Sequence, residues 1–231
     1  MKQNEERDGM SLLFSQKNFL GIVGMGTKEK TQKYIFKEFL GWLEAILLAV
    51  LISLLIRAFV FETVYVDGSS MEHTLSNGDR LILYKLGYFF SPPKRGDIVV
   101  LQVNEGTFRY FPFINKLPIV KRALHGIDET DYIKRVIGIP GDEVDIKDGY
   151  VYINNEKLEE PYVYGEATYE GNIELPVKVE EGTVFVLGDN RLNSRDSREL
   201  GLIEYDKIKG KAIYRVWPLD RFGSIYKNNQ K

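Results

Sequence analysis

An apolar stretch close to the N-terminus constrains the fold of this chain more than any other feature. Almost every side chain from Phe39 to Phe61 is apolar. The two charged exceptions, Glu44 and Arg57, lie toward the ends of the stretch, where long side chains can reach lipid headgroups. A helix of about 20 residues crosses the hydrocarbon core of a bilayer. The sequence therefore predicts a transmembrane anchor at residues 39–61, between a polar tail at 1–38 and a separate domain at 62–231.

Two other structures remain possible for this stretch, a buried core helix and a cleaved signal peptide, because its uninterrupted part covers only residues 45–56. No small-x-small cleavage site follows it, which favours an anchor. The basic residues that precede it are Lys28, Lys30, Lys33 and Lys37, and the acidic residues that follow it are Glu62, Asp67 and Glu72. The positive-inside rule then predicts a cytoplasmic N-terminus, an extracytoplasmic domain after Glu62 and a location in the cell membrane.

The composition excludes several kinds of site. The 31 basic and 33 acidic residues leave a net charge of −2, so no basic field indicates a nucleic-acid partner. The chain has no cysteine and two histidines, which excludes disulfides and leaves little for a zinc or haem site. We therefore expect no metal and no cofactor.

Beyond the anchor, short β-rich runs alternate with turn signals. The predicted strands cover residues 63–66, 80–86, 97–103, 132–139, 143–146, 150–153, 183–187 and 211–217. Asn154 and Asn155 predict a hairpin turn after one of these strands. The spacing predicts a mostly β fold, a coiled antiparallel sheet or barrel-like domain behind one helix.

Three polar motifs follow the apolar stretch in a fixed order. The first is Gly68-Ser69-Ser70-Met71 with Thr74-Leu75, and the second is Tyr132-Ile133-Lys134-Arg135 with Gly138-Ile139-Pro140-Gly141-Asp142. The third, Gly188 to Arg198, gathers two carboxylates, two amides, two hydroxyls and three guanidiniums. From about Leu40 to Gly223 the chain resembles the type I signal peptidases, membrane-bound serine proteases that use a lysine base, and in particular their short single-anchor members from Gram-positive bacteria. The resemblance implies the same barrel-like fold.

Ser70 and Lys134 are the predicted catalytic pair. A serine hydroxyl needs a neighbouring base, and a lysine serves as one only if burial lowers its pKa toward the working pH. Lys134 lies in an apolar run, on the strand face that also carries Tyr132 and Val136. Taken alone, Ser70 could belong to an ordinary turn and Lys134 could face water, but the motif matches favour the pair.

The resemblance also implies supporting roles. Ser194 would hydrogen-bond the lysine amine, while Asp196 and Arg198 would form an ion pair that braces the loop. Asp189 and Asn190, followed by Arg191, would shape the turn that leads into it. Some family members carry a serine two residues before the nucleophile, and this chain has Gly68 there, so an oxyanion hole would use backbone donors such as the Ser70 N–H.

Five residues match substrate-contacting positions of the family. They are Val66, Met71, Leu75, Tyr132 and Ile133, which would line shallow apolar pockets. For each of them ordinary core packing is an equal alternative.

The sequence departs from the family pattern at His73, where proline is usual. A histidine near a serine raises the alternative of a Ser-His-Asp triad with Asp189 or Asp196. That alternative would leave the lysine motif unexplained, so we expect His73 to occupy an exposed turn.

An aromatic and basic segment at residues 104–131 is less typical of the shorter members. Its aromatic side chains include Phe108, Tyr110, Phe111 and Phe113, and Tyr88 to Phe90 forms a second aromatic tip. We expect either an inserted hairpin with a small core or contacts with the bilayer interface.

The sequence thus predicts a membrane-bound endopeptidase that removes signal peptides from secreted preproteins after a small-x-small site, with the preprotein cleavage region and the lipid bilayer as partners. Two alternatives belong to other classes. One is an inactive, membrane-tethered homologue that acts as a binding module, and the other is a self-cleaving Ser/Lys repressor. The repressor needs a DNA-binding helix pair instead of an anchor and an Ala-Gly or similar cleavage site, and the chain contains no Ala-Gly.

Overall fold

A computed structural model describes residues 34–104, 116–117, 130–165 and 167–226. The chain divides into two compact units, Met1–Ser53 and Leu54–Lys231. Most of the predicted tail at 1–38 and most of the 104–131 segment lie outside the described residues, and with the latter go Phe108, Tyr110, Phe111 and Phe113.

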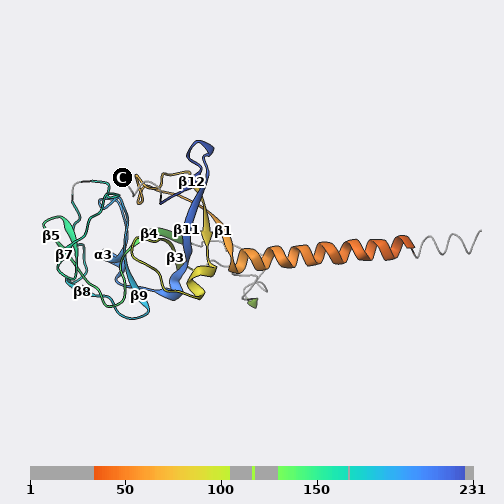
Figure 1. The fold of residues 1–231 in the computed structure, drawn as a ribbon, viewed down its shortest axis with the longest axis horizontal. Helices are drawn as coiled ribbons and strands as arrows, with labels where there is room; N and C mark the ends of the chain where they lie inside the picture. The colour runs from red at the N-terminus through yellow and green to blue at the C-terminus, as the bar shows by residue number, and fades with distance from the viewer. Residues whose placement is uncertain (1–33, 105–115, 118–129, 166, 227–231) are drawn as a thin grey trace, which may run out of the picture. The chain divides into compact units, whose positions relative to one another are not determined.

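The apolar stretch forms one helix, Tyr34–Phe59, of 26 residues with a mean hydropathy of 2.5. Figure 1 shows it as one continuous helix. Its large apolar side chains are exposed, as a membrane-spanning helix requires. The described helix already includes the five residues before the predicted Phe39, among which Lys37 and Glu38 are good helix formers. It ends at Phe59, and Phe61 already belongs to the first strand.

The larger sheet has eight strands in the order β1-β2-β11-β3-β4-β9-β10, with β12 paired to β11. These strands are β1 (Phe61–Tyr65), β2 (Arg80–Tyr84), β3 (Ile98–Asn104), β4 (Thr130–Gly138), β9 (Thr183–Leu187), β10 (Ile203–Glu204), β11 (Ile208–Trp217) and β12 (Gly223–Ser224). Every pairing in it is antiparallel.

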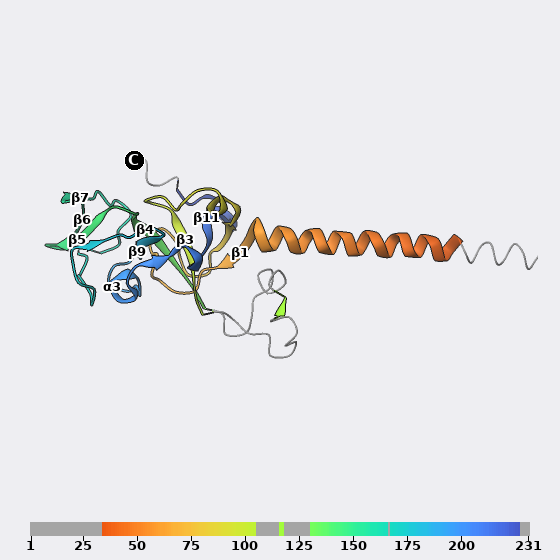
Figure 2. The same cartoon turned by 90° about the horizontal axis from the view of Figure 1, so that it is seen from below.

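A second antiparallel sheet has four strands in the order β7-β6-β5-β8 and lies at one end of the unit Leu54–Lys231 (Figure 2). Its strands are β5 (Glu143–Lys147), β6 (Tyr150–Ile153), β7 (Glu156–Lys157) and β8 (Val177–Lys178). Asn154 and Asn155 connect β6 to β7 with φ of 53° and 68°. Two positive φ values are typical of the tight hairpin turn that the sequence predicted.

The mostly β fold class is confirmed, and the helices that the structure describes after Phe59 are short. They are α3 (Ser197–Leu200) and the 3-10 turns η1 (Leu86–Phe89), η3 (Tyr205–Lys207) and η4 (Leu219–Arg221). The sequence analysis missed the two-residue strands β7, β8, β10 and β12, because so few residues show no alternation of apolar and polar side chains.

Strand β4 carries Lys134, and in the described sheets residues 132–134 have a strand partner on one side only. It pairs with β3 from Thr130 to Arg135, but its pairing with β9 begins only at Arg135. Strand β1 pairs with β2 alone in the described sheets. The sheet curls so that the turn after β1 reaches the unpaired part of β4, as the contact between Ile133 and the core around Val66 and Met71 shows.

Candidate active site

Ser70 and Lys134 are in direct contact. Ser70 lies in the connection between β1 and β2, residues 66–79, which we call the serine turn. Lys134 lies in β4. Lys134 Nζ is 2.9 Å from Ser70 Oγ and also donates a hydrogen bond to the Ile133 carbonyl at 2.8 Å. Lys134 is 3% exposed, whereas Ser70 is half-buried. Ser70 therefore lies between the buried lysine and the solvent.

The surroundings of Lys134 favour a neutral amine. Burial lowers the pKa of Lys134 from 10.5 to about 8, because desolvation penalises the ammonium form. The carboxylates of Asp196 and Asp189 oppose this shift, and the guanidinium of Arg198 adds to it. The Tyr132 ring lies on the same strand face, with its centroid 5.2 Å from Lys134 Nζ.

The polar loop that begins at Gly188 holds the backbone of the serine turn. The Asn190 backbone N–H donates to the Ser70 carbonyl at 3.0 Å, and the Asn190 side chain donates to the Ser69 carbonyl at 3.1 Å. Asn193 Nδ2 donates to Ser69 Oγ at 2.6 Å. The sequence pattern indicates no specific role for Asn193, although this residue lies in the polar motif Gly188 to Arg198. Two amide side chains from one loop thus fix the chain just before Ser70.

A buried ion pair links the same loop to the residue after Lys134. Arg135 donates two hydrogen bonds to Asp189, from Nε at 2.8 Å and from Nη2 at 2.6 Å. Asp189 also accepts a hydrogen bond from Thr74 Oγ1 at 2.5 Å. The sequence motifs contain Arg135 and Thr74 but indicate no role for either residue. The tertiary structure shows that both bind Asp189.

Asp196 and Arg198 also form a buried ion pair. Arg198 Nε and Nη2 each lie 2.8 Å from a carboxylate oxygen of Asp196. Asp196 also accepts a hydrogen bond from the Gly188 N–H at 3.0 Å and caps α3 through the Arg198 N–H. Arg191, in the same loop, is paired with Glu160 and donates to Thr168. These contacts make the loop rigid.

The predicted hydrogen bond between Ser194 and Lys134 is not formed. Ser194 Oγ is buried and has no hydrogen-bond partner among the described residues. The lysine amine is occupied instead by Ser70 and by the Ile133 carbonyl. The hydroxyl points toward Gly188, where a Cβ atom would collide with it.

Three of the five residues expected to line pockets are core residues. Val66, Met71 and Leu75 are 5%, 1% and 0% exposed and pack in one cluster, so in this structure they present almost no surface to a ligand. Tyr132 and Ile133 are half-buried and keep access to solvent beside Ser70. Gly68 has a φ of +107°, which favours glycine, and its N–H donates to Asn77 Oδ1 at 3.0 Å.

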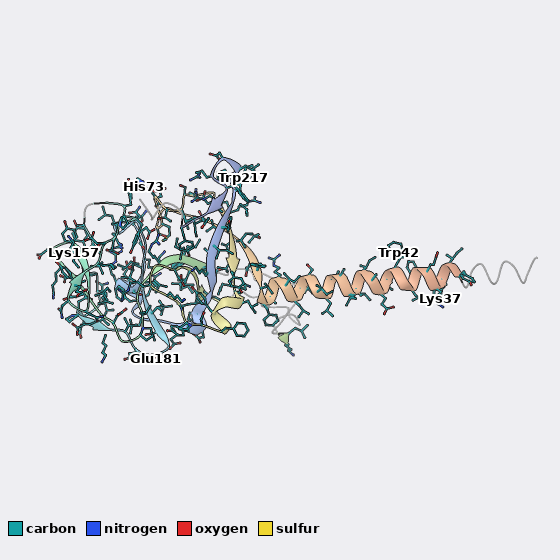
Figure 3. The ribbon with its side chains drawn as sticks, viewed as in Figure 1. Lys37, Trp42, His73, Lys157, Glu181 and Trp217 are labelled. Atoms are coloured by element: carbon teal, nitrogen blue, oxygen red, sulfur yellow. The ribbon has the colours of Figure 1, made fainter. Side chains whose placement is uncertain are left out.

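His73 is exposed (Figure 3), and its ring contacts that of Tyr164 in a tilted arrangement with centroids 4.3 Å apart. Both oxygens of Asp189 are bound by Arg135, and both oxygens of Asp196 are bound by Arg198. The Ser-His-Asp arrangement is therefore not formed. In the aromatic tip, Tyr88 donates to Asp97 at 2.8 Å, whereas Phe90 is exposed.

In the described part of the chain, no group of three or more His, Cys, Asp or Glu side chains is arranged to hold a metal ion.

Comparison with known proteins gives consistent results. The family described as "Signal peptidase, peptidase S26" matches residues 39–217. Signal peptidase I of Bacillus licheniformis is 40% identical over 188 residues, which are 78% of this chain and 89% of the relative. Signal peptidase I T of Bacillus subtilis is 40% identical over 200 residues, covering 83% of this chain and 92% of the relative.

A crystal structure of a signal peptidase I from Enterococcus faecalis is 27% identical and covers 52% of this chain and 97% of that chain. Its TM-score of 0.36 is too low to carry a fold assignment. The family match spans most of the chain, and both Bacillus relatives are similar over nearly their whole length. The chain therefore belongs to the signal peptidase I family, the serine peptidases that cleave signal peptides from preproteins.

Proposed function

We propose that Ser70 is the nucleophile and Lys134 the general base of this signal peptidase. The observation that carries the proposal is the 2.9 Å contact between Lys134 Nζ and Ser70 Oγ in a site where the lysine is almost fully buried. With a pKa of about 8, a large fraction of the amine is neutral at mildly alkaline pH. A neutral amine has a lone pair that can take the proton of the serine hydroxyl.

The steps of the reaction can be followed through the proton of the Ser70 hydroxyl. As Ser70 Oγ attacks the scissile carbonyl, its proton moves to Lys134 Nζ. The resulting ammonium gives that proton to the leaving amine, and the signal peptide stays bound to Ser70 as an ester. Neutral Lys134 next takes a proton from the water that attacks the ester, and it gives this proton to Ser70 Oγ as the signal peptide leaves as a carboxylate. The Ile133 carbonyl accepts a hydrogen bond from the amine and keeps it aimed at the serine.

Backbone donors would stabilise the oxyanion. No described residue accepts a hydrogen bond from the Ser70 N–H, so this donor is available to the developing negative charge. Position 68 is glycine and offers no hydroxyl. The Asn190 N–H binds the Ser70 carbonyl and thereby holds the peptide plane after the nucleophile in place.

The substrate would bind as an extended strand beside β4. Among the described strands, residues 132–134 of β4 pair only with β3, so their other backbone edge can pair with a peptide. In an extended peptide alternate side chains point to the same face. The residue before the cleaved bond and the residue two positions earlier would therefore both face the protein, near Tyr132 and Ile133, and close contact would admit only small side chains there.

The membrane anchor completes the proposal. The helix Tyr34–Phe59 is long and apolar enough to cross a bilayer. We propose the orientation predicted from the charges, with the N-terminus in the cytoplasm and the catalytic unit outside. In that arrangement the enzyme meets the cleavage region of an exported preprotein where it leaves the membrane.

The test is cleavage of a preprotein with a small-x-small site by detergent-solubilised protein, with the cut mapped by mass spectrometry. Ser70→Ala and Lys134→Met should each abolish cleavage in a folded protein. Lys134→Arg should stay inactive, because a guanidinium does not lose its proton. His73→Ala is the control and should retain most activity. Full activity of Ser70→Ala or Lys134→Met would refute the proposal.

A further inference from the structure

The hairpin at the C-terminal end of the catalytic unit is connected to the serine turn by charged side chains. It consists of the end of β11, the turn η4 and strand β12, and Trp217 marks its position (Figure 3). Arg215 lies in β11 and Arg221 in η4. Both guanidiniums point back to the segment that follows Ser70.

The meeting point is Asp79, a carboxylate with 0% exposure. Arg215 Nε lies 2.9 Å from Asp79 Oδ2, and Arg221 Nη2 lies 2.9 Å from Asp79 Oδ1. The Ser76 N–H also donates to Asp79 Oδ2 at 3.0 Å. Two cations from the hairpin therefore compensate one buried anion at the end of the serine turn.

Each arginine also binds the serine turn directly. Arg215 Nη2 donates to the Thr74 carbonyl at 2.6 Å, and Arg221 Nη1 donates to Ser76 Oγ at 3.0 Å. Arg215 thus uses different nitrogens for Asp79 and for Thr74. A lysine at position 215 has one nitrogen and cannot reproduce this fork.

Thr74 joins these contacts to the lysine side of the site. Its hydroxyl donates to Asp189, and Asp189 is held by Arg135, the residue after Lys134. The hydrogen bonds therefore form a continuous path from Arg215 to the strand that carries Lys134. They hold the backbone on both sides of the Ser70–Lys134 contact.

We infer that Arg215 and Arg221 are positioning residues for catalysis, which act by holding the turn of Ser70 against Lys134. The inference rests on the proposed roles of Ser70 and Lys134. A nucleophile displaced by about 1 Å through a distant substitution can lose about 100-fold in rate. Since neither arginine contacts the proposed peptide-binding edge of β4, their loss should lower kcat much more than it changes KM.

Arg215→Lys separates positioning from stability. Lysine can keep the charge opposite Asp79 but not the simultaneous bond to the Thr74 carbonyl. We expect kcat to fall about 10- to 100-fold with KM within about twofold, and a melting temperature close to that of the unsubstituted protein. If kcat stays normal while the protein remains folded, the inference is wrong.

Arg221→Gln has a matched control in Arg95→Gln. The side chains of Arg221 and Arg95 are 41% and 36% exposed, and each is paired with one buried carboxylate, Asp79 and Asp142 respectively. Arg95 lies before β3 and makes no described contact with the serine turn. We expect Arg221→Gln to lower kcat about 10-fold and Arg95→Gln to leave kcat unchanged at a similar loss of melting temperature. Equal kcat values in the two variants would overturn the inference.

Failure of the positioning role can be distinguished from failure of the proposed catalytic pair. An active Ser70→Ala protein would refute that pair, and with it the basis of this inference. An inactive Ser70→Ala protein together with normal kcat for Arg215→Lys and Arg221→Gln would refute only the positioning role.

Discussion

Arg135 and Asp189 form a fully buried, bidentate ion pair, with side chains that are 1% and 0% exposed. The pair joins the residue after Lys134 to the loop that binds the Ser69 and Ser70 carbonyls. Loss of one partner of a buried ion pair leaves an uncompensated charge and is strongly destabilising. The geometry of the active site and the stability of the fold therefore depend on the same contact.

Asp189→Asn should lower the free energy of unfolding by about 3–5 kcal/mol, because the Arg135 charge would stay buried without its partner. Chemical denaturation monitored by circular dichroism measures this change. Lys147→Ala is the control, since Lys147 also pairs with an aspartate but its side chain is 56% exposed. It should barely move the midpoint. Similar midpoints for both variants would contradict the role assigned to the buried pair.

The pH dependence of kcat/KM should follow Lys134. Only the neutral amine can accept the serine proton, so activity should rise with pH through about 8, the pKa of Lys134. Initial rates at low substrate concentration between pH 6 and 10 test this. The profile of His73→Ala should have the same acidic limb. A limb that moves in His73→Ala would assign the titration to the histidine instead.

Lys134→Met should stabilise the protein near neutral pH. The folded-state pKa of Lys134 is lowered from 10.5 to about 8, so the unfolded chain binds more protons between these values and stability rises with pH across that window. Below pH 8 the unsubstituted protein bears the full cost of a buried ammonium, about 3 kcal/mol. Removal of the amine should return up to that amount, and the gain should vanish toward pH 10.5. Chemical denaturation of Lys134→Met and of the unsubstituted protein, at pH 7 and at pH 10, measures the gain in unfolding free energy at each pH. An equal gain at both pH values would contradict the buried-ammonium explanation.

Gly188→Ala should inactivate the enzyme. A Cβ atom at this position would collide with the Ser194 side chain and come within 2.6 Å of the Ser70 carbonyl. Either the loop or the serine turn must then move. In Gly87→Ala, the control, the new Cβ would approach only the Tyr84 ring, at 3.0 Å or more. Cleavage assays on both folded variants test the prediction, and an active Gly188→Ala would show that the loop yields without moving Ser70.

A fragment that starts at Leu54 should fold, and one that starts at Thr63 should be less stable. The second fragment lacks Glu62, which forms a buried ion pair with Lys85, and it also lacks the first strand residue, Phe61. Lys85, whose side chain is 2% exposed in the full chain, would lose the carboxylate that compensates its charge. Melting temperatures of the two fragments make the comparison. Equal values would show that the start of β1 contributes nothing to the catalytic unit.

Much of this protein follows from local sequence. The apolar stretch predicted a long helix, because a membrane-spanning helix is specified by one continuous run of apolar, helix-compatible side chains. Alternation of apolar and polar residues identified the longer strands, including β4 with Lys134, and Asn154-Asn155 identified a hairpin turn. The order of the three motifs identified the family, since each motif is a short continuous segment.

Tertiary structure alone decided which polar side chains meet. Arg135 and Asp189 are 54 residues apart, and Arg215 and Thr74 are 141 residues apart, so no local pattern records either contact. The expected bond from Ser194 to Lys134 was wrong because the direction of a buried hydroxyl depends on packing against Gly188. Likewise, Val66, Met71 and Leu75 look identical as pocket residues and as core residues until the curl of the sheet buries them. Neighbouring residues determine local geometry. The pairing of buried charges depends instead on which distant strands pack together in the folded chain.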